Sequence, residues 1–115
     1  MKTSHPLELD KIGDPVVRSA IEAMNKRDKG QWYRSFSDHP ALTDDGIAHE
    51  FTEWCESELF GSSLAYLVSI DRVEDAGPTI YGKFHSDQWG DFKTFLRFRV
   101  EDGVITKMDV GQTEY

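Results

Sequence analysis

The sequence predicts an α+β fold, with helices in the first half of the chain and an antiparallel sheet in the second. Apolar residues recur with helical spacing as far as residue 60, and from residue 64 onward they alternate at every second position. Short turn sequences separate the alternating stretches, so we expect a meander of four strands. One face of such a sheet is apolar and has to be covered, and only the helices can cover it.

The first helix is predicted to begin at Pro15 and to end near Gly30. Asp14 provides an N-cap acceptor, and proline suits the first helical position. Gly30 favours a break after the basic residues that close the helix. Apolar positions form one stripe: Val17, Ala20, Ile21 and Met24. Residues 1–13 show weak periodicity and are expected to form an N-terminal tail, which leaves residues 14–115 as a single domain.

Two further helices and a brief strand are expected before the meander. Gln31–Phe36 is predicted to be a short helix or turn that ends before His39-Pro40, because the residue before proline avoids helical angles. Residues 41–43 suit a brief strand. A third helix is expected from about Gly46 to Phe60, with Gly61 as its stop.

The alternating stretches predict strands around residues 64–71, 80–84, 92–100 and 104–110. Turns are expected at residues 76–78, 87–91 and 101–103. Beside the apolar face, the alternation predicts a mixed face on which apolar and charged residues intermingle: Leu67, Tyr81, Phe95, Ile105, Lys83, Arg97, Arg99, Lys107 and Asp109. Such a face is rather apolar for bare solvent, so we expect a homodimer through the sheet face.

Composition excludes several functional classes. Thirteen basic and 21 acidic side chains leave a formal net charge of −8, and a negative field repels phosphate, so neither nucleic acid nor an anionic membrane is expected as a partner. No stretch approaches the length of a membrane span, and no secretory leader is recognisable, which favours a cytoplasmic protein.

Metal and thiol chemistry are not expected either. Cys55 is the single cysteine, so no internal disulfide or cysteine-based zinc site can form, and it suits a small buried hydrophobe. The four histidines lack the spacing of a helical metal pair. We therefore expect no metal and no cofactor.

The chain resembles the nuclear transport factor 2-like superfamily, which includes ketosteroid isomerases and polyketide cyclases. The resemblance covers about residues 14–112 and rests on three stretches, MNKRDKGQWYRSF, SDHPALTDDG and TFLRFRVEDGVITKMDVG. It implies helices packed across a curved sheet in a cone-shaped, cystatin-like α+β barrel, with a pocket open at one end. It also implies dimerisation through the sheet. Because this fold hosts catalysts, binders and scaffolds, it does not imply a particular activity.

Of the three functional groups in the isomerase site, the resemblance places only one on a matching residue of this chain. The position resembling the general base falls on Asp44, whereas the positions resembling the oxyanion-hole acid and tyrosine fall on Thr94 and near Ala20. A threonine hydroxyl cannot replace a tyrosine and a protonated acid together. Steroid isomerase activity is therefore not expected.

Asp44 is the candidate catalytic residue, and it has a structural alternative. It can serve as a general base that faces an apolar cavity. Alternatively, Asp44 or Asp45 is the N-cap of the third helix, or the pair divides the two roles, with Asp45 as the cap.

Candidate ligand-binding residues are mainly aromatic: Trp32, Phe36, Trp54, Tyr66 and Thr94. The alternative is that these side chains fill the interior. Trp89, in a predicted turn, can anchor a partner or ligand at the rim, or fold back over the sheet edge.

Two functional hypotheses follow. The first is a protein that binds a small apolar molecule in a conical pocket, with isomerase- or lyase-type proton transfer by Asp44 and with Thr94 and Tyr66 as polar partners. The second is a non-catalytic dimeric interaction or scaffold module whose cone is filled by side chains. A cavity of at least ~300 Å³ favours the first, because that is the lower size of small-molecule sites.

Overall fold

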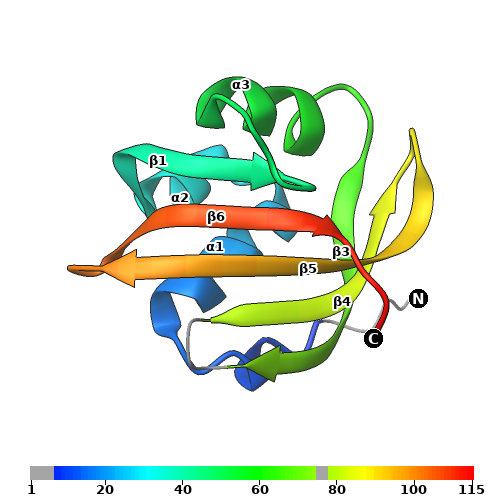
Figure 1. Ribbon diagram of the computed structural model, residues 1–115, viewed down its shortest axis with the longest axis horizontal. Coiled ribbons are helices and arrows are strands. Elements are labelled where there is room, and N and C mark those ends of the chain that lie inside the picture. The colour runs from blue at the N-terminus through cyan, green and yellow to red at the C-terminus, as the bar shows by residue number, and fades with distance from the viewer. Residues whose placement is uncertain (1–6, 75–77) are drawn as a thin grey trace.

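The structure, a computed structural model, describes residues 7–74 and 78–115 and has the predicted α+β architecture (Figure 1). Six strands form one sheet in the order β2-β1-β6-β5-β4-β3. Their bounds are β1 Phe36–Asp44, β2 Ile47–Ala48, β3 Ala65–Glu74, β4 Thr79–Ser86, β5 Gly90–Glu101 and β6 Val104–Gln112. The α-helices are α1 Pro15–Lys26, α2 Lys29–Arg34 and α3 Phe51–Trp54, and α3 continues into a π-helical turn, η2, at Cys55–Leu59.

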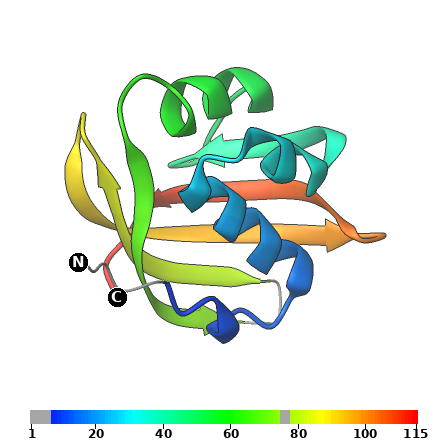
Figure 2. The same ribbon diagram turned by 180° about the vertical axis from the view of Figure 1, so that it is seen from behind.

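The predicted sheet was wrong in one respect. Its strands are not all antiparallel, because β1 pairs in parallel with β6, with Leu42 opposite Met108. The sheet is curved and mixed, and β2 and β3 are its two open edges, so it does not close into a barrel. Helices α1 and α2 cover one face of it, as the view from behind shows (Figure 2).

Helix α1 begins as predicted and ends earlier than predicted. The carboxylate of Asp14 accepts hydrogen bonds from the amides of Val16 and Val17, at 2.8 and 3.2 Å. The helix ends at Arg27, whose φ is +58°, while Gly30 lies inside α2. A tertiary contact explains this end point. The Arg27 guanidinium donates to the carbonyl oxygens of Leu59, the last residue of η2, and of Gly61 just after it.

The described part of the predicted tail is packed against the fold. Leu9–Lys11 forms a 3-10 turn, η1, and Ile12 is buried in the core. Lys11 Nζ donates to the carbonyl oxygen of Ile70 in β3, and the Arg18 guanidinium donates to that of Ile12. Residues 7–13 are therefore a structural part of the domain.

A second correction to the predicted fold concerns the segment before α3. Residues 36–44 form one long strand, and Asp45 and Gly46 turn the chain with φ values of +50° and +84°, so that Asp44 pairs with Ile47. Two positive φ values are typical of a two-residue type I′ hairpin. Helix α3 begins only at Phe51, and its N-cap is Glu50 rather than either aspartate.

Bulges in the sheet change which residues face inward. The pairing register shifts in β3 between Leu67 and Ser69, and between β5 and β6 at Arg99 and Val100. Leu67 and Ile105, which were predicted on the mixed face, are instead buried in the core. The prediction missed this because a bulge interrupts the period of two. The predicted turn at residues 76–78 lies largely outside the described residues.

Candidate functional site

A cavity of about 320 Å³ lies between the sheet and the helices, and it exceeds the size chosen above as the discriminator. Its inner wall is apolar and comes from helix α1, η2 and the three central strands. The residues of this wall are Met24, Leu59, Phe84, Leu96, Met108 and Val110. Alternation places the side chains of Leu96, Met108 and Val110 on the face that α1 covers, where they are buried.

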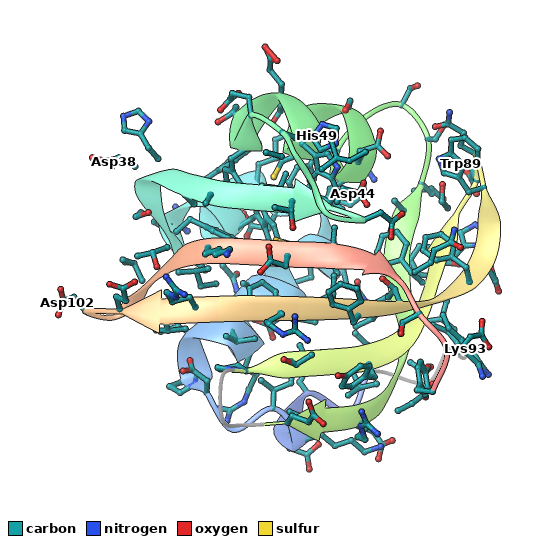
Figure 3. All side chains as sticks on the ribbon, viewed as in Figure 1. Asp38, Asp44, His49, Trp89, Lys93 and Asp102 are labelled. Carbon is teal, nitrogen blue, oxygen red and sulfur yellow. The ribbon has the colours of Figure 1, made fainter. Side chains whose placement is uncertain are left out.

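The mouth of the cavity is acidic and aromatic. The carboxylates of Asp44, Asp45 and Glu58 line it, together with the indoles of Trp54 and Trp89. Trp89 is 68% exposed, in the turn between β4 and β5. Figure 3 shows Asp44 at the end of β1 near α3, and Trp89 in the turn between β4 and β5. Within residues 7–74 and 78–115, no lysine, arginine or histidine lines the cavity.

Asp44 reaches the cavity because it follows Leu42 on the inward face of β1. Its Oδ2 atom accepts a hydrogen bond of 3.1 Å from Trp54 Nε1. The other carboxylate oxygen, Oδ1, accepts no hydrogen bond from the described residues. The neighbouring Asp45 is turned differently, and its Oδ1 accepts from the backbone amide of Gln112 at 3.0 Å. The predicted N-cap role of Asp45 is therefore wrong, because its carboxylate holds the hairpin turn against β6, while Asp44 faces the cavity.

Thr94 lines the cavity, but its hydroxyl proton is already used. Thr94 Oγ1 donates to the buried carbonyl oxygen of Gly111 at 2.7 Å. In this arrangement the hydroxyl can accept a hydrogen bond from a ligand and cannot donate one. The residue thus lies where the sequence placed it and lacks the donor function expected of it.

The structure does not bring the other predicted pocket residues to the cavity. Trp32 and Phe36 pack against each other in the core, with ring centroids 4.7 Å apart, and are 0% and 6% exposed. Tyr66 is 38% exposed and lies against the His85 ring on the opposite face of the sheet. Their placement as pocket-lining residues was wrong. Tyr66 alternates with the inward-facing Ala65 and Leu67, so its side chain must point outward.

Glu58 and Phe92 are among the lining residues that were not candidates, whereas Trp89 was considered only as an anchor at the rim. Glu58 belongs to the acidic side of the third helix, and nothing in its spacing distinguishes it from its solvated neighbours. Trp89 carried a usable signal, because a tryptophan in a turn is poorly placed for a core. Phe92 follows the same alternation as Thr94 and could have been found from it.

Outside the cavity, two titratable groups have environments of their own. His85 bridges two aspartates, with Nε2 2.8 Å from Asp87 and Nδ1 2.5 Å from Asp91. These hydrogen bonds, led by the one to Asp87, raise the pKa of His85 above its usual range. Burial raises the pKa of the Cys55 thiol to about 12, against a smaller opposing effect of the Trp32 indole, so the thiol is unreactive at neutral pH. No cluster of three or more metal-ligating side chains occurs in the described part of the chain.

The sequence matches no family model and no curated protein. Solved structures with this fold were found. An NTF2-like protein of unknown function from Cytophaga hutchinsonii is 13% identical, with a TM-score of 0.71, and the match covers 98% of this chain and 95% of that one. A provisionally assigned polyketide cyclase from Sinorhizobium meliloti is 16% identical, with a TM-score of 0.68 and coverage of 90% and 98%. A computationally designed 17-OHP binder is 11% identical, with a TM-score of 0.69 and coverage of 83% and 86%.

These similarities show that the chain has the nuclear transport factor 2-like, cystatin-like fold, as the sequence predicted. They do not assign an activity, because identities of 11–16% establish the fold alone. None of the described helices is long and apolar enough to cross a membrane.

Proposed function

We propose that the protein binds a small, largely apolar molecule in the cavity beside Asp44. The observation that carries this proposal is the cavity itself, with about 320 Å³ of space and an inner wall of aliphatic, methionine and phenylalanine side chains. A concave apolar wall with a few polar groups at the mouth is the usual form of a small-molecule site. The designed 17-OHP binder shows that a protein of similar fold can serve as a binder.

The cavity supports binding more strongly than proton transfer. Asp44 is oriented by Trp54 and lines the cavity, which supports a role as a base. Abstraction of a proton next to a carbonyl, however, develops negative charge on oxygen and needs hydrogen-bond donors aimed at it. Thr94 donates to backbone and Tyr66 lies outside the cavity. Further carboxylates at the mouth would repel the developing charge. An isomerase or lyase step is therefore the secondary form of this proposal.

A fluorescent probe and a matched pair of variants test binding. N-phenyl-1-naphthylamine is small, apolar and uncharged, and its emission rises in an apolar site. We expect Val110→Phe to fill part of the cavity and weaken probe binding by at least about tenfold, which is ~1.4 kcal/mol. Val104→Phe, in the same strand but away from the cavity, is the control. Equal probe affinity in wild type and Val110→Phe would refute the proposal.

The predicted homodimer through the sheet face stays a prediction. On that face Tyr81 and Phe95 are half-buried, and arginines of the same chain lie over both rings, with Arg72 4.2 Å from the Tyr81 centroid and Arg97 5.3 Å from that of Phe95. Light scattering on wild type and on Phe95→Glu tests it. A dimer that Phe95→Glu dissociates is expected, and a monomeric wild type would exclude it.

A further inference from the structure

We infer that the ligand of this cavity is an organic cation, a compact apolar body that carries a protonated amine. The inference rests on the proposed binding function and adds the charge of the ligand. It combines two features of the site: the sign of the charges at the mouth and the aromatic rings beside them.

The charges at the mouth are all negative. Asp44, Asp45 and Glu58 line the cavity. An adjoining surface hollow of about 340 Å³ shares Asp44, Trp54 and Glu58 with it, and adds Glu50 and Glu53. Among the residues that the structure describes, no lysine or arginine lines either space, and His49, in the outer hollow, is the one histidine. Several carboxylates around a partly enclosed space concentrate a negative potential there, which attracts cations.

This asymmetry is local rather than an average of the net charge of −8. Basic side chains gather on the opposite, helix-free face of the sheet, including Lys83, Lys93, Arg97, Arg99 and Lys107. The cross-strand pairing places Lys83 opposite Lys93 and Arg99 opposite Lys107. These strand lysines and arginines therefore lie on the side of the sheet away from the cavity mouth.

The groups at the mouth suit an ammonium in particular. Oδ1 of Asp44 accepts no hydrogen bond from a described residue, and Trp54 holds the carboxylate by its other oxygen. An ammonium group can donate a hydrogen bond to Oδ1 of Asp44. The Trp54 ring lies beside the same carboxylate and the exposed Trp89 ring lies at the rim, and indole faces attract cations more strongly than other aromatic rings do. The apolar wall then receives the body of the ligand.

A matched trio of compounds tests the charge. 1-Adamantylamine, 1-adamantanol and 1-adamantanecarboxylate share one compact apolar body and differ at neutral pH only in being cationic, neutral or anionic. Titration calorimetry of the full chain at pH 7 and low salt measures the affinity for each. We expect the amine to bind at least about tenfold more tightly than the alcohol, or ~1.4 kcal/mol, and the carboxylate to bind most weakly. The preference for the amine should shrink as salt is raised.

Two variants and one control assign the effect to the mouth. Asp44→Asn keeps the shape of the side chain and should weaken binding of the amine about tenfold more than it weakens binding of the alcohol. Glu58→Gln, at an exposed position, should reduce the same preference less and serves if Asp44→Asn is unstable. Asp102→Asn removes the same formal charge from the tip of the β5–β6 hairpin, at the opposite end of the sheet from Trp89 (Figure 3), and should change nothing.

The outcomes separate the two proposals. If the alcohol binds as tightly as the amine, the cavity is a binding site and the inference about charge is wrong. The same holds if Asp102→Asn lowers the amine preference as much as Asp44→Asn does, because the effect is then one of net charge. If none of the three compounds binds, and N-phenyl-1-naphthylamine does not bind either, both the binding function and the charge inference are overturned.

Discussion

The hydrogen bond between Trp54 and Asp44 can be tested by removing each partner. It joins α3 to the end of β1 at 3.1 Å and orients the carboxylate on which both proposals depend. Trp54→Phe removes the donor and keeps a ring. Asp44→Ala removes the acceptor, whereas asparagine would retain an oxygen that could still accept. Each single change also alters packing, so the double variant is needed to isolate the interaction.

The magnitude follows from the environment of the two groups. A hydrogen bond to a charged acceptor contributes about 1.5–3 kcal/mol when it is shielded from water. Asp44 and Trp54 are both only half-buried, so solvent competes and screens, and we expect a coupling of ~1 kcal/mol. For a domain of this size, ~1 kcal/mol corresponds to a change in Tm of roughly 4 °C.

Urea denaturation of the wild type, the two single variants and the double variant provides the assay. The coupling is the difference between the sum of the two single effects and the effect of the double variant. A coupling below ~0.3 kcal/mol, within the usual additivity of independent sites, would refute the reasoning. It would mean that Trp54 does not hold Asp44 in solution.

Three further predictions concern stability and reactivity. Because folding raises the pKa of His85, the stabilising effect of this residue is fully present below pH ~6.5 and is lost as the pH rises through the folded-state pKa. Thermal melts should therefore show a larger loss of Tm from wild type to His85→Gln at pH 5.5 than at pH 9. An equal loss of Tm at the two pH values would contradict the assignment. Gly82→Ala would place a Cβ atom 2.0 Å from the backbone oxygen of Ser69, so we expect the free energy of unfolding from urea titrations to fall by about 3 kcal/mol or more. Gly30→Ala is the control. Its added Cβ atom would lie 3.1 Å from the Arg34 guanidinium, which can move, so this variant should be neutral or stabilising. Cys55 should react with a thiol reagent at pH 8 only at the rate of unfolding, and rapid labelling of the native protein would show that it is accessible.

Local patterns were enough to predict the class of fold. The N-cap at Asp14 and the stripe of α1 depend only on residues a few positions apart, and both are confirmed. The inward alternation of β5 is confirmed for the same reason. Features that depend on distant partners were missed. The end of α1 at Arg27 is stabilised by carbonyl groups more than 30 positions away, and the parallel pairing of β1 with β6 joins the two halves of the chain.

The candidate site shows the same difference between features set by the local sequence and features set by distant contacts. Asp44, Trp54 and Thr94 line the cavity. The inward side of the third helix and of β5 could be inferred for Trp54 and Thr94, whereas Asp44 was identified only by the family resemblance. Trp32 and Tyr66 were misplaced, since an aromatic ring suits a core, a cavity wall and a surface equally well in sequence. The packing of α2 places Trp32 in the core, and the alternation of β3 turns Tyr66 outward to the surface.

The sequence by itself determined that helices precede a meander of strands, and it determined the first turn of α1 and the inward face of β5. These follow from the short-range geometry of the backbone, which repeats every 3.6 or 2 residues. The tertiary structure alone decided that space remains between η2 and the sheet, that the Thr94 hydroxyl is satisfied by backbone, and that three carboxylates and two indoles meet at one opening. A cavity and a local electric field arise from the distances between elements, and no local pattern along the chain encodes those distances.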